Sequence, residues 1–559
     1  MLAPVFRSGV VMRMFLFGLF AMTAAAAAPV QVSVDLARSE GPFVQTTNWF
    51  GYDEANYTTM ANGRALLKDL HDAYAVPVHI RAHHLFTSGD GTSGMKWSST
   101  GVFKLGPDGK PVYNFKIVDA IFDAYKKAGI TPMVELGFMP QDLSVRPEPY
   151  HIAFGKGEVL DSGAQFPPKD YAVWGELVRT FVAHLRDRYG AETTRTWLWE
   201  VWNEPDIPYW HGTREEYFKL YDYAVAGVRA ALPDARVGGP ATTNPDSQRA
   251  GDFLRAFLEH CAKEPSAADG QKVPLDFISF HAKGAPEVAD GRVRMGLANE
   301  LKAMQEGFRI VAASPYAKLP IVLSEADPEG CAACSAKQNP ANAYRNGPLY
   351  AAYTAAAHKA MLELAAREKV NLAGMLSWSF EFENTGYFEG FRSLASNGIG
   401  KPVLNFFRMA GKMEGDRVAA TSAAEPSAET IIAQGVRKEP EIGVLATGKD
   451  HRAAVMLWNY HDDEASAPPS TATLAIAGVP AGRVTLSQFR IDDTHSNAYA
   501  LWQAMGSPQT PEPEQYAKLK KASGLMPFET PRVVTVKNGW IVLPLSLPRQ
   551  SVSLFLLDW

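Results

Sequence analysis

The sequence predicts an α/β protein, a (β/α)8 TIM barrel followed by a C-terminal antiparallel β-sandwich. Strand-like and helix-like segments alternate from about residue 43 to 410, and eight such units are what this barrel requires. After about residue 412, short runs of period-two or continuous apolar character replace the helical spacing, which favours a sandwich. We therefore assign residues 42–412 to the barrel and residues 413–559 to the sandwich.

Eight apolar runs are expected to form the barrel strands, because strands of a parallel sheet are buried on both faces. A doubly wound open sheet is the main alternative, but no glycine-rich phosphate-binding fingerprint follows the first run. In chain order the runs are Phe43–Trp49, Val76–Phe86, Thr131–Phe138, Thr196–Trp202, Arg236–Ala241, Leu275–His281, Leu319–Glu325 and Leu372–Phe380.

Amphipathic helices are expected between these strands. Two segments show apolar residues at helical spacing, and Thr213 with Glu216 three residues later predicts a capping box for the second. The first apolar face is formed by Trp174, Leu177, Val178, Phe181 and Leu185, and the second by Tyr217, Leu220, Tyr221, Ala224 and Val228.

The tail contains short strand-like runs and almost no helical spacing. Asn538-Gly539 separates two of the runs and predicts a tight hairpin turn. Residues 29–41 include a stretch, Val30–Leu36, with one alternating apolar face, and we expect this N-terminal strand to join the sandwich. The tail runs are Ala453–Trp458, Val484–Ile491, Val533–Val536, Trp540–Leu545 and Val552–Leu557.

The N-terminus has the pattern of an export signal. Arg7 and Arg13 precede the apolar run Met14–Met22, and the alanine tract Ala24–Ala28 follows. That run is shorter than the roughly 20 apolar residues of a membrane span. We expect residues 1–28 to be a signal peptide, the mature protein to be periplasmic or secreted, and no membrane to be bound after cleavage.

Charge and cysteine content exclude several classes of function. The formal net charge of −5, from 55 basic and 60 acidic residues, argues against nucleic acid or an anionic membrane as partner. Three cysteines are too few for a disulfide scaffold, and no second ligand pair completes a zinc site. In an oxidising compartment Cys331 and Cys334 are expected to form a local loop disulfide, with two free thiols as the alternative.

A glutamate follows the fourth predicted strand, in the stretch Trp199–Pro205. Catalytic groups of a barrel cluster at the C-terminal ends of its strands, where the active-site loops begin. Strand alternation places Glu200, Trp202 and Glu204 on one face and Asn203 on the other, unless a bulge redirects it. An isolated glutamate at a strand end is usually a solvated loop carboxylate, but Asn-Glu-Pro after an apolar strand is more specific.

A second glutamate, Glu325, closes the seventh predicted strand. Strands 4 and 7 stand on opposite walls of an eight-stranded barrel, so Glu204 and Glu325 are expected to face each other across its mouth. Glycosidic cleavage uses such a pair, one carboxyl as proton donor and the other as nucleophile or base. A separation of about 5–5.5 Å gives retention of configuration, and a wider gap gives inversion.

The chain resembles glycoside hydrolase family 39, the β-xylosidases and α-L-iduronidases, within the clan of retaining barrel glycosidases. The resemblance implies a barrel plus sandwich, a retaining mechanism and no cofactor, with Glu204 as acid/base and Glu325 as nucleophile. It extends over nearly all of the chain after the export signal. The matching stretches are Glu200–Pro205, Tyr217–Tyr221, Val237–Pro240, Phe277–His281, Glu325–Pro328, Arg490–Asn497 and Trp502–Pro508.

The resemblance also implies roles in sugar binding. Asn203 corresponds to the residue that hydrogen-bonds the sugar 2-hydroxyl, His281 to a pocket histidine and Trp378 to an aromatic platform. His84 is expected to touch the sugar. The alternatives are a core histidine for His281 and a core tryptophan for Trp378. Hydroxyl-binding acids are expected after strand 8, or else an exposed acidic loop; the candidates are Glu381, Glu383 and Glu389.

The substrate is expected to be a xylo-oligosaccharide. Xylosidases of the family commonly carry tyrosine where this chain has Lys283, whereas in the iduronidases a lysine there pairs with the substrate carboxylate. We expect Lys283 to point to solvent or to a glutamate such as Glu381. The signal pattern and Tyr387–Phe391 resemble members described as xylosidases. The alternatives are an α-L-iduronidase-like uronidase, a β-L-arabinopyranosidase, and a carbohydrate-binding protein on an inactive barrel, which would be expected to have lost one carboxylate.

Overall fold

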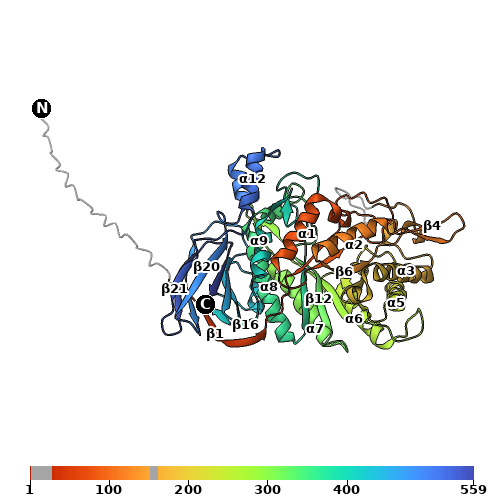
Figure 1. Cartoon of the computed structure of the whole chain (residues 1–559), viewed down its shortest axis with the longest axis horizontal. Helices are drawn as coiled ribbons and strands as arrows, with labels where there is room; N and C mark the ends of the chain where they lie inside the picture. The colour runs from red at the N-terminus through yellow and green to blue at the C-terminus, as the bar shows by residue number, and fades with distance from the viewer. Residues whose placement is uncertain (2–27, 152–160) are drawn as a thin grey trace.

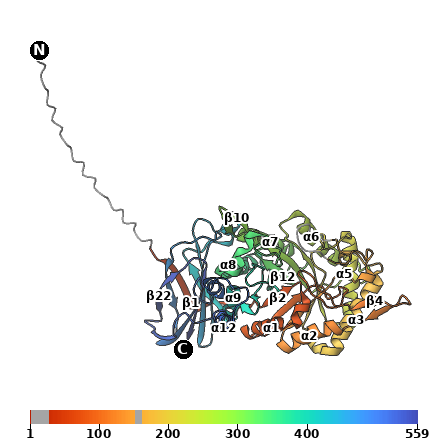
Figure 2. The same cartoon turned by 90° about the horizontal axis from the view of Figure 1, so that it is seen from above.

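The computed structural model describes residue 1, residues 28–151 and residues 161–559. The predicted signal peptide, apart from its two end residues, lies outside the described residues. The described chain forms a barrel and a separate sheet domain that lie side by side (Figures 1 and 2). Among the described helices none has the length and apolar character of a membrane span.

Eight parallel strands close into a barrel in the order β12-β13-β2-β3-β6-β7-β8-β9, which confirms the predicted fold class. Seven of them overlap the predicted strands over most of their length, and the eighth, β2, meets its prediction at a single residue. The eight are β2 (Trp49–Tyr52), β3 (His79–Ala82), β6 (Thr131–Leu136), β7 (Leu198–Val201), β8 (Arg236–Thr242), β9 (Phe277–Lys283), β12 (Pro320–Asp327) and β13 (Asn371–Trp378).

The first strand was predicted too early in the chain. The prediction Phe43–Trp49 meets the observed β2 only at Trp49. Val44 is largely exposed, and Gly51 lies inside the strand because a Cβ there would meet the Trp378 ring at 2.4 Å. A glycine normally weakens a strand, so the sequence pattern argued against a strand at Trp49–Tyr52, where packing against Trp378 places it.

Helices surround the barrel as predicted. The apolar face from Trp174 to Leu185 is buried in α3, and the Thr213–Glu216 capping box is present at the start of α5. The main helices are α1 (Ala61–Ala73), α2 (Lys116–Ala128), α3 (Tyr171–Tyr189), α5 (Arg214–Ala231), α6 (Gln248–Lys263), α7 (Leu297–Ala312), α8 (Pro348–Glu368) and α9 (Pro402–Ala410).

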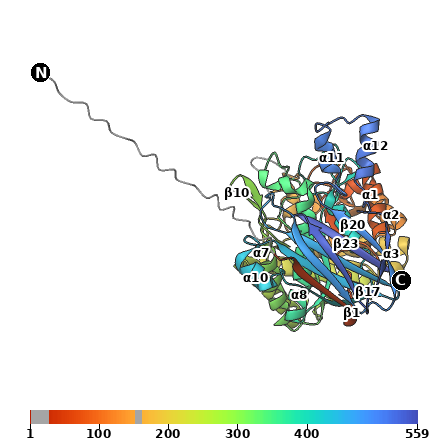
Figure 3. The same ribbon diagram turned by 90° about the vertical axis from the view of Figure 1, so that its left-hand side faces the viewer.

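The second domain is a nine-stranded sheet in the order β21-β20-β23-β18-β17-β16-β1-β19-β22, visible in Figure 3. Strands from both ends of this order bury side chains in one apolar cluster, so the sheet folds over itself as a sandwich. The N-terminal strand β1 (Val30–Pro42) joins it, antiparallel to β16 and parallel to β19. The other strands are β16 (Asp416–Ser422), β17 (Glu441–Lys449), β18 (Arg452–Tyr460), β19 (Ser470–Ala477), β20 (Arg483–Ile491), β21 (Arg532–Thr535), β22 (Ile541–Leu547) and β23 (Ser551–Asp558).

The tight hairpin turn predicted at Asn538-Gly539 is present: both residues have positive φ, and Lys537 and Trp540 exchange backbone hydrogen bonds across it. Beyond this bridge the flanking strands do not pair with each other, because β21 pairs with β20 and β22 pairs with β19 at the opposite edge of the sheet. Helices also occur where helical spacing was nearly absent. They are short and bury few side chains, which leaves little periodicity to detect; they are α10 (Ala428–Gln434), α11 (Ala498–Ala504) and α12 (Pro513–Ala522).

The two domains share one apolar core. Helix α8 packs against β18 and β23 and lies between barrel and sheet in Figures 1 and 2. Trp458 and Leu554 of the sheet belong to the same buried cluster as the barrel side chains. Farther along the interface, Trp502 and Leu519 pack on Phe388 of the loop that follows β13. The position of the barrel mouth relative to the sheet is therefore fixed by apolar packing.

Candidate active site

The two glutamates singled out in the sequence meet at the C-terminal ends of their strands. A carboxylate oxygen of Glu204, one of Glu325 and a ring nitrogen of His281 all lie within 4.8 Å of one another. Nδ1 of His281 is 2.8 Å from Oε1 of Glu204, and its Nε2 is 3.8 Å from Oε1 of Glu325. The imidazole therefore lies between the two carboxylates.

The chain leaves β7 abruptly before Glu204. Trp202 has φ 70° and Glu204 has φ 43°, so strand alternation ends at Val201. Trp202 turns away and packs among aromatic rings such as Trp174 of α3. The prediction that it shares a face with Glu200 and Glu204 was therefore wrong. Asn203, expected on the opposite face, is instead redirected into the barrel.

Both oxygens of Glu325 contact cations. Oε1 accepts from Nη1 of Arg81 at 3.3 Å, and Oε2 accepts from Nζ of Lys283 at 2.7 Å. Burial alone would raise the pKa of Glu325, but the charges of His281, Lys283, Arg81 and His83 together lower that pKa well below its ordinary value. Glu325 is consequently held as a carboxylate, the form that can attack an anomeric carbon.

Arg81 of β3 organises the barrel interior beneath Glu325. Its guanidinium contacts Glu200 at 2.5 Å and Glu135 at 2.9 Å, and all three side chains are fully buried. Its Nη2 also donates to Oδ1 of Asn203 at 3.0 Å. Arg81 thus joins Asn203 to Glu325. The arginine was missed in the sequence, although a charge within the apolar stretch Val76–Phe86 was the available signal.

Trp378 at the end of β13 lies in the wall of the site. Its ring centroid is 4.1 Å from that of His83, and Arg81 lies over the indole at 5.1 Å. Asp53 contacts both rings: its carboxylate lies 3.3 Å from Nε1 of Trp378 and 2.7 Å from Nδ1 of His83. Burial alone would lower the pKa of His83, but Glu135 and Asp53 raise it to about 10. His83 therefore adds positive charge near Glu325.

Three other predicted residues are bonded within their own loops. His84 is buried next to Thr87, and burial lowers its pKa to about 3. Glu381 accepts from the Gly398 amide at 2.5 Å, and burial raises its pKa to about 7. Glu389 is exposed and accepts from the Gly386 amide. Within the described residues, no hydrogen bond or ion pair joins these three side chains to Glu204 or Glu325, so a role in sugar binding stays a prediction.

Lys283 points to a glutamate, which was one of the two expectations, but the glutamate is Glu325 and not Glu381. Its Nζ lies 2.7 Å from Oε2 of Glu325 and 2.6 Å from Oδ2 of Asp327. The reason is register. Lys283 of β9 is the direct partner of Asp327 in β12, and His281 is the partner of Glu325. Such pairing could not be seen in the sequence.

The loop after β12 contains the expected disulfide between Cys331 and Cys334. Arg345 donates to the carbonyl oxygens of Cys331 and Cys334 and pairs with Glu329 at 2.5 Å. Glu329 also pairs with Arg392, whose other amino group lies 3.4 Å from Asp327. The disulfide loop is thereby tied to the charged groups around Glu325.

Glu204, His281 and Glu325 offer donor atoms at a spacing that a divalent metal could bridge. However, Glu325 already contacts two cationic side chains, Arg81 and Lys283. Their positive charge compensates the carboxylate and would repel a metal cation. The arrangement suits acid/base and nucleophilic chemistry instead.

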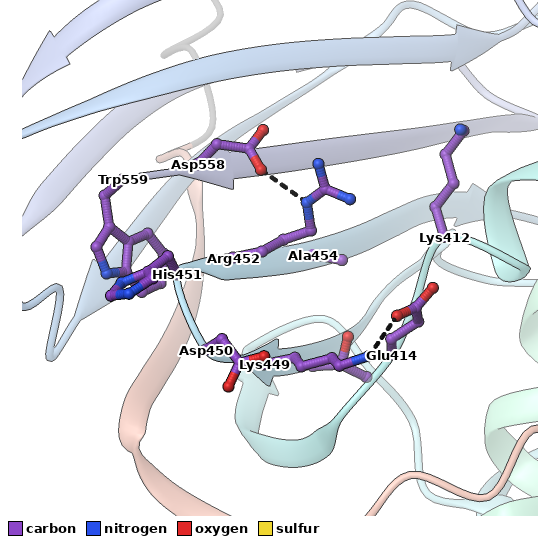
Figure 4. Close-up of a pocket in the computed structure, with 10 residues that line it drawn as sticks. Lys412, Glu414, Lys449, Asp450, His451, Arg452, Ala454, Asp558 and Trp559 are labelled. Carbon is purple, nitrogen blue, oxygen red and sulfur yellow. Dashed lines mark hydrogen bonds and ion pairs between the residues drawn. The ribbon is translucent and has the colours of Figure 1, made fainter. Parts of the chain in front are cut away.

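A groove on the sheet domain is a second hollow of the molecule. Its volume is about 360 Å³, and it lies beside the hairpin of β17 and β18 (Figure 4). Its charged side chains pair with one another, Lys449 with Glu414 at 3.0 Å and Arg452 with Asp558 at 2.7 Å. None of its lining residues belongs to the carboxylate site, so the groove contributes nothing to that chemistry.

The profile described as Glycosyl hydrolases family 39 matches residues 86–539. This chain belongs to glycoside hydrolase family 39. A β-xylosidase of Geobacillus stearothermophilus is 28% identical over 465 residues, covering 80% of each protein. An α-L-iduronidase of Mus musculus is 25% identical over 473 residues, covering 79% of this chain and 68% of the iduronidase.

Solved structures agree with this membership. A monomeric β-xylosidase from Caulobacter crescentus CB15 superimposes on this glycoside hydrolase with a TM-score of 0.73 at 25% identity, over 94% of this chain and 99% of the other. A family 39 enzyme from Xanthomonas axonopodis pv. citri, 23% identical, gives a TM-score of 0.75 over 97% and 100%; at that identity it supports the fold alone. This chain is therefore a glycoside hydrolase with a carbohydrate substrate.

Proposed function

We propose that the protein is a retaining exo-β-xylosidase that releases xylose from the non-reducing ends of xylo-oligosaccharides. The observation that carries the mechanism is the approach of Glu204 and Glu325, whose nearest oxygens lie within 4.8 Å. Retaining glycosidases hold their carboxyl groups about 5–5.5 Å apart, whereas inverting enzymes leave roughly 6.5–9.5 Å for a water molecule. The short separation supports double displacement.

In the first step, an oxygen of Glu325 bonds to the anomeric carbon. The bond from that carbon to the leaving oxygen breaks, and Glu204 donates its proton to the departing oxygen. In the second step, Glu204 takes a proton from water, the water oxygen bonds to the anomeric carbon, and the electron pair of the ester bond returns to Glu325. The Glu204 side chain is 15% exposed against 6% for Glu325, which fits its contact with water.

Two further residues have roles that follow from their contacts. Oδ1 of Asn203 accepts from Arg81, so the Nδ2 group is the one that donates to the sugar 2-hydroxyl. That hydrogen bond strengthens in the transition state. The resemblance assigns Trp378, whose buried ring contacts His83 and Arg81, to the aromatic platform under the sugar. Both assignments rest on the proposed mechanism and on the resemblance to family 39.

A neutral pentose is favoured over a uronic acid by the state of Lys283. Its Nζ already contacts the two carboxylates of Glu325 and Asp327, and a third carboxylate from the substrate would add negative charge there. The relatives include xylosidases at 28% identity and iduronidases at 25–26%. The ion pairs of Lys283 support a xylosidase over an iduronidase for this chain.

A comparison of two aryl glycosides tests the proposal. The purified protein is assayed with 4-nitrophenyl β-xyloside and with 4-methylumbelliferyl α-L-iduronide, and 4-nitrophenyl α-L-arabinopyranoside serves as a pentoside of different configuration. We expect turnover of the xyloside with a kcat/KM at least 100-fold above that for the iduronide. Turnover of the iduronide alone would contradict the assignment of the sugar.

We also propose that the protein is exported to the periplasm or beyond. The support is the N-terminal pattern of Arg7, Arg13 and the run Met14–Met22, together with the Cys331–Cys334 disulfide, a bond favoured in oxidising compartments. Expression of the full chain in a Gram-negative host, followed by N-terminal sequencing of the periplasmic fraction, checks this. Uncleaved protein confined to the cytosol would contradict it.

A further inference from the structure

The strands β9 and β12 bring four ionisable side chains to one face. Their register pairs His281 with Glu325 and Lys283 with Asp327, and residues two apart on a strand share a face. The two pairs therefore lie next to each other on the same face of the sheet. His281 contacts Glu204 and Glu325, whereas Lys283 contacts Glu325 and Asp327.

Asp327 is fixed independently of Lys283. Its side chain is fully buried, and Oδ1 accepts from the backbone amide of Trp378 at 3.0 Å. Its Oδ2 lies 3.4 Å from Arg392, which is anchored in turn by Glu329 at 2.6 Å. Since Asp327 cannot swing toward Glu325, the ammonium group of Lys283 is held at one point beside Oε2 of Glu325.

We propose that Lys283, held by Asp327, is a positioning residue that fixes Oε2 of Glu325 and stabilises the carboxylate when it leaves the glycosyl-enzyme. This inference rests on the proposed retaining mechanism. It assigns Lys283 to the enzyme's own nucleophile and not to a charged group on the substrate. Arg81 holds the other oxygen, Oε1, at 3.3 Å, so the carboxylate is fixed at both ends.

The chemistry predicts which step depends most on Lys283. In the second step the bond between Glu325 and the anomeric carbon breaks, and the electron pair returns to the carboxylate. A cation beside Oε2 stabilises this developing charge. In the first step the same carboxylate loses charge, so the cation gives no comparable advantage. Loss of Lys283 should therefore slow deglycosylation more than glycosylation.

Several ionisable groups besides Lys283 lie around Glu325, and replacing Lys283 removes none of these side chains. They lie on or after six strands of the barrel: Arg81 within β3 and His83 after it, His281 of β9, Glu204 after β7, Asp53 after β2, Asp327 of β12 and Arg392 of the loop after β13. Because Lys283 lowers the pKa of Glu325, its removal should move the acid limb of activity to higher pH.

The test compares Lys283→Met, Lys283→Arg and Asp327→Asn with wild type. The control is Lys449→Met, which removes a lysine–glutamate pair in the groove of the sheet domain. The substrate is a 2,4-dinitrophenyl glycoside of whichever sugar the wild type hydrolyses. Its good leaving group makes deglycosylation limiting, so that kcat reports the second step and kcat/KM the first. Thermal unfolding of each variant verifies that it is folded.

For Lys283→Met we expect kcat to fall by about 100-fold, KM to fall with it, and kcat/KM to change by less than about 10-fold. The glycosyl-enzyme should accumulate in intact-mass spectra, and the acid limb of kcat/KM should move to higher pH. Lys283→Arg should recover part of kcat. Asp327→Asn should also lower kcat more than kcat/KM, but by a smaller factor than Lys283→Met. The control should behave as wild type.

Two results would overturn the inference. One is a rise in KM with unchanged kcat, which would mean that Lys283 binds the substrate. The other is an equal fall in kcat and kcat/KM with no accumulated intermediate and no move of the acid limb, which would mean a merely structural role. Failure of the proposed function can be distinguished from failure of this inference, because it is seen with the wild type alone. A wild type that hydrolyses only the iduronide, or that inverts the configuration of the sugar, would contradict the proposed function before any variant is measured.

Discussion

Nδ1 of His281 lies 2.8 Å from Oε1 of Glu204, and the same ring reaches Glu325 with its other nitrogen. The imidazole is fully buried, so it sets the orientation of the proton donor relative to the nucleophile. The contact of His281 with Glu325 follows from their direct pairing across β9 and β12.

Replacing His281 should therefore misplace the proton donor. We expect His281→Ala to lower kcat/KM on an aryl β-xyloside by about 100-fold, since small misplacements of a catalytic group cost that much. His184→Ala, which removes a histidine–aspartate pair from the helix surface, is the matched control and should keep wild-type rates. Full activity of His281→Ala would show that the contact does not matter.

The assignment of the two carboxylates is tested by azide rescue. Glu325→Ala should lose activity by about 10⁵-fold, and azide should restore turnover with formation of the α-glycosyl azide, because azide then attacks directly from the vacated face. Glu204→Ala should retain the first step on substrates with good leaving groups, and azide should give the β-glycosyl azide. NMR of the products identifies the anomers. Interchanged anomers would reverse the two roles.

The buried cation beneath the site should dominate local stability. Arg81→Leu leaves the fully buried Glu200 without a counter-charge and leaves Glu135 with His83 alone, and we expect a loss of about 3–5 kcal/mol in the free energy of unfolding. Urea unfolding measures it. Lys68→Met removes an exposed lysine–aspartate pair and should cost no more than about 1 kcal/mol. Equal effects of the two changes would contradict this account of the charge network.

His83 should make stability depend on pH. Its pKa in the folded protein, about 10, lies above its ordinary value of 6.5, so protonated His83 favours the fold. This stabilisation is complete below about pH 6.5 and is lost as the pH rises toward 10. Between these values the wild type should lose unfolding free energy more steeply than His83→Gln. Parallel curves for the two proteins would show that His83 is not protonated in the fold.

The sheet domain should be required for folding of the barrel. Trp458 and Leu554 lie in the same buried cluster as the barrel side chains, and helix α8 packs on β18 and β23. A truncation to residues 29–412 would expose this surface, and we expect it to be insoluble or unfolded by circular dichroism. A soluble, active truncation would contradict the shared core.

The sequence was informative where local pattern determines structure. Strands buried on both faces appear as apolar runs, and the glutamates at the ends of two such runs indicated the chemistry. Prediction failed where long-range packing decides. The first strand contains Gly51 because the Trp378 ring lies against it, and the ladder partners of β21 and β22 depend on the folding of the whole sheet.

The site shows the same division. Glu204, Glu325 and His281 could be proposed from strand ends and motifs. The partners of Lys283 could not, because they depend on the register between β9 and β12. Arg81 was overlooked because a single charge in an apolar run has no visible partner until Glu135 and Glu200 are brought beside it. Redirection of Asn203 required the positive φ of Trp202, which local pattern does not reveal.

The stereochemistry of hydrolysis tests the central claim most directly. Proton NMR during cleavage of an aryl β-xyloside shows which anomer of xylose forms first, before mutarotation mixes the two. Glu204 and Glu325, with oxygens within 4.8 Å of each other, predict that β-xylose appears first. Initial release of α-xylose would mean that water attacks the sugar directly, and would contradict a glycosyl-enzyme on Glu325.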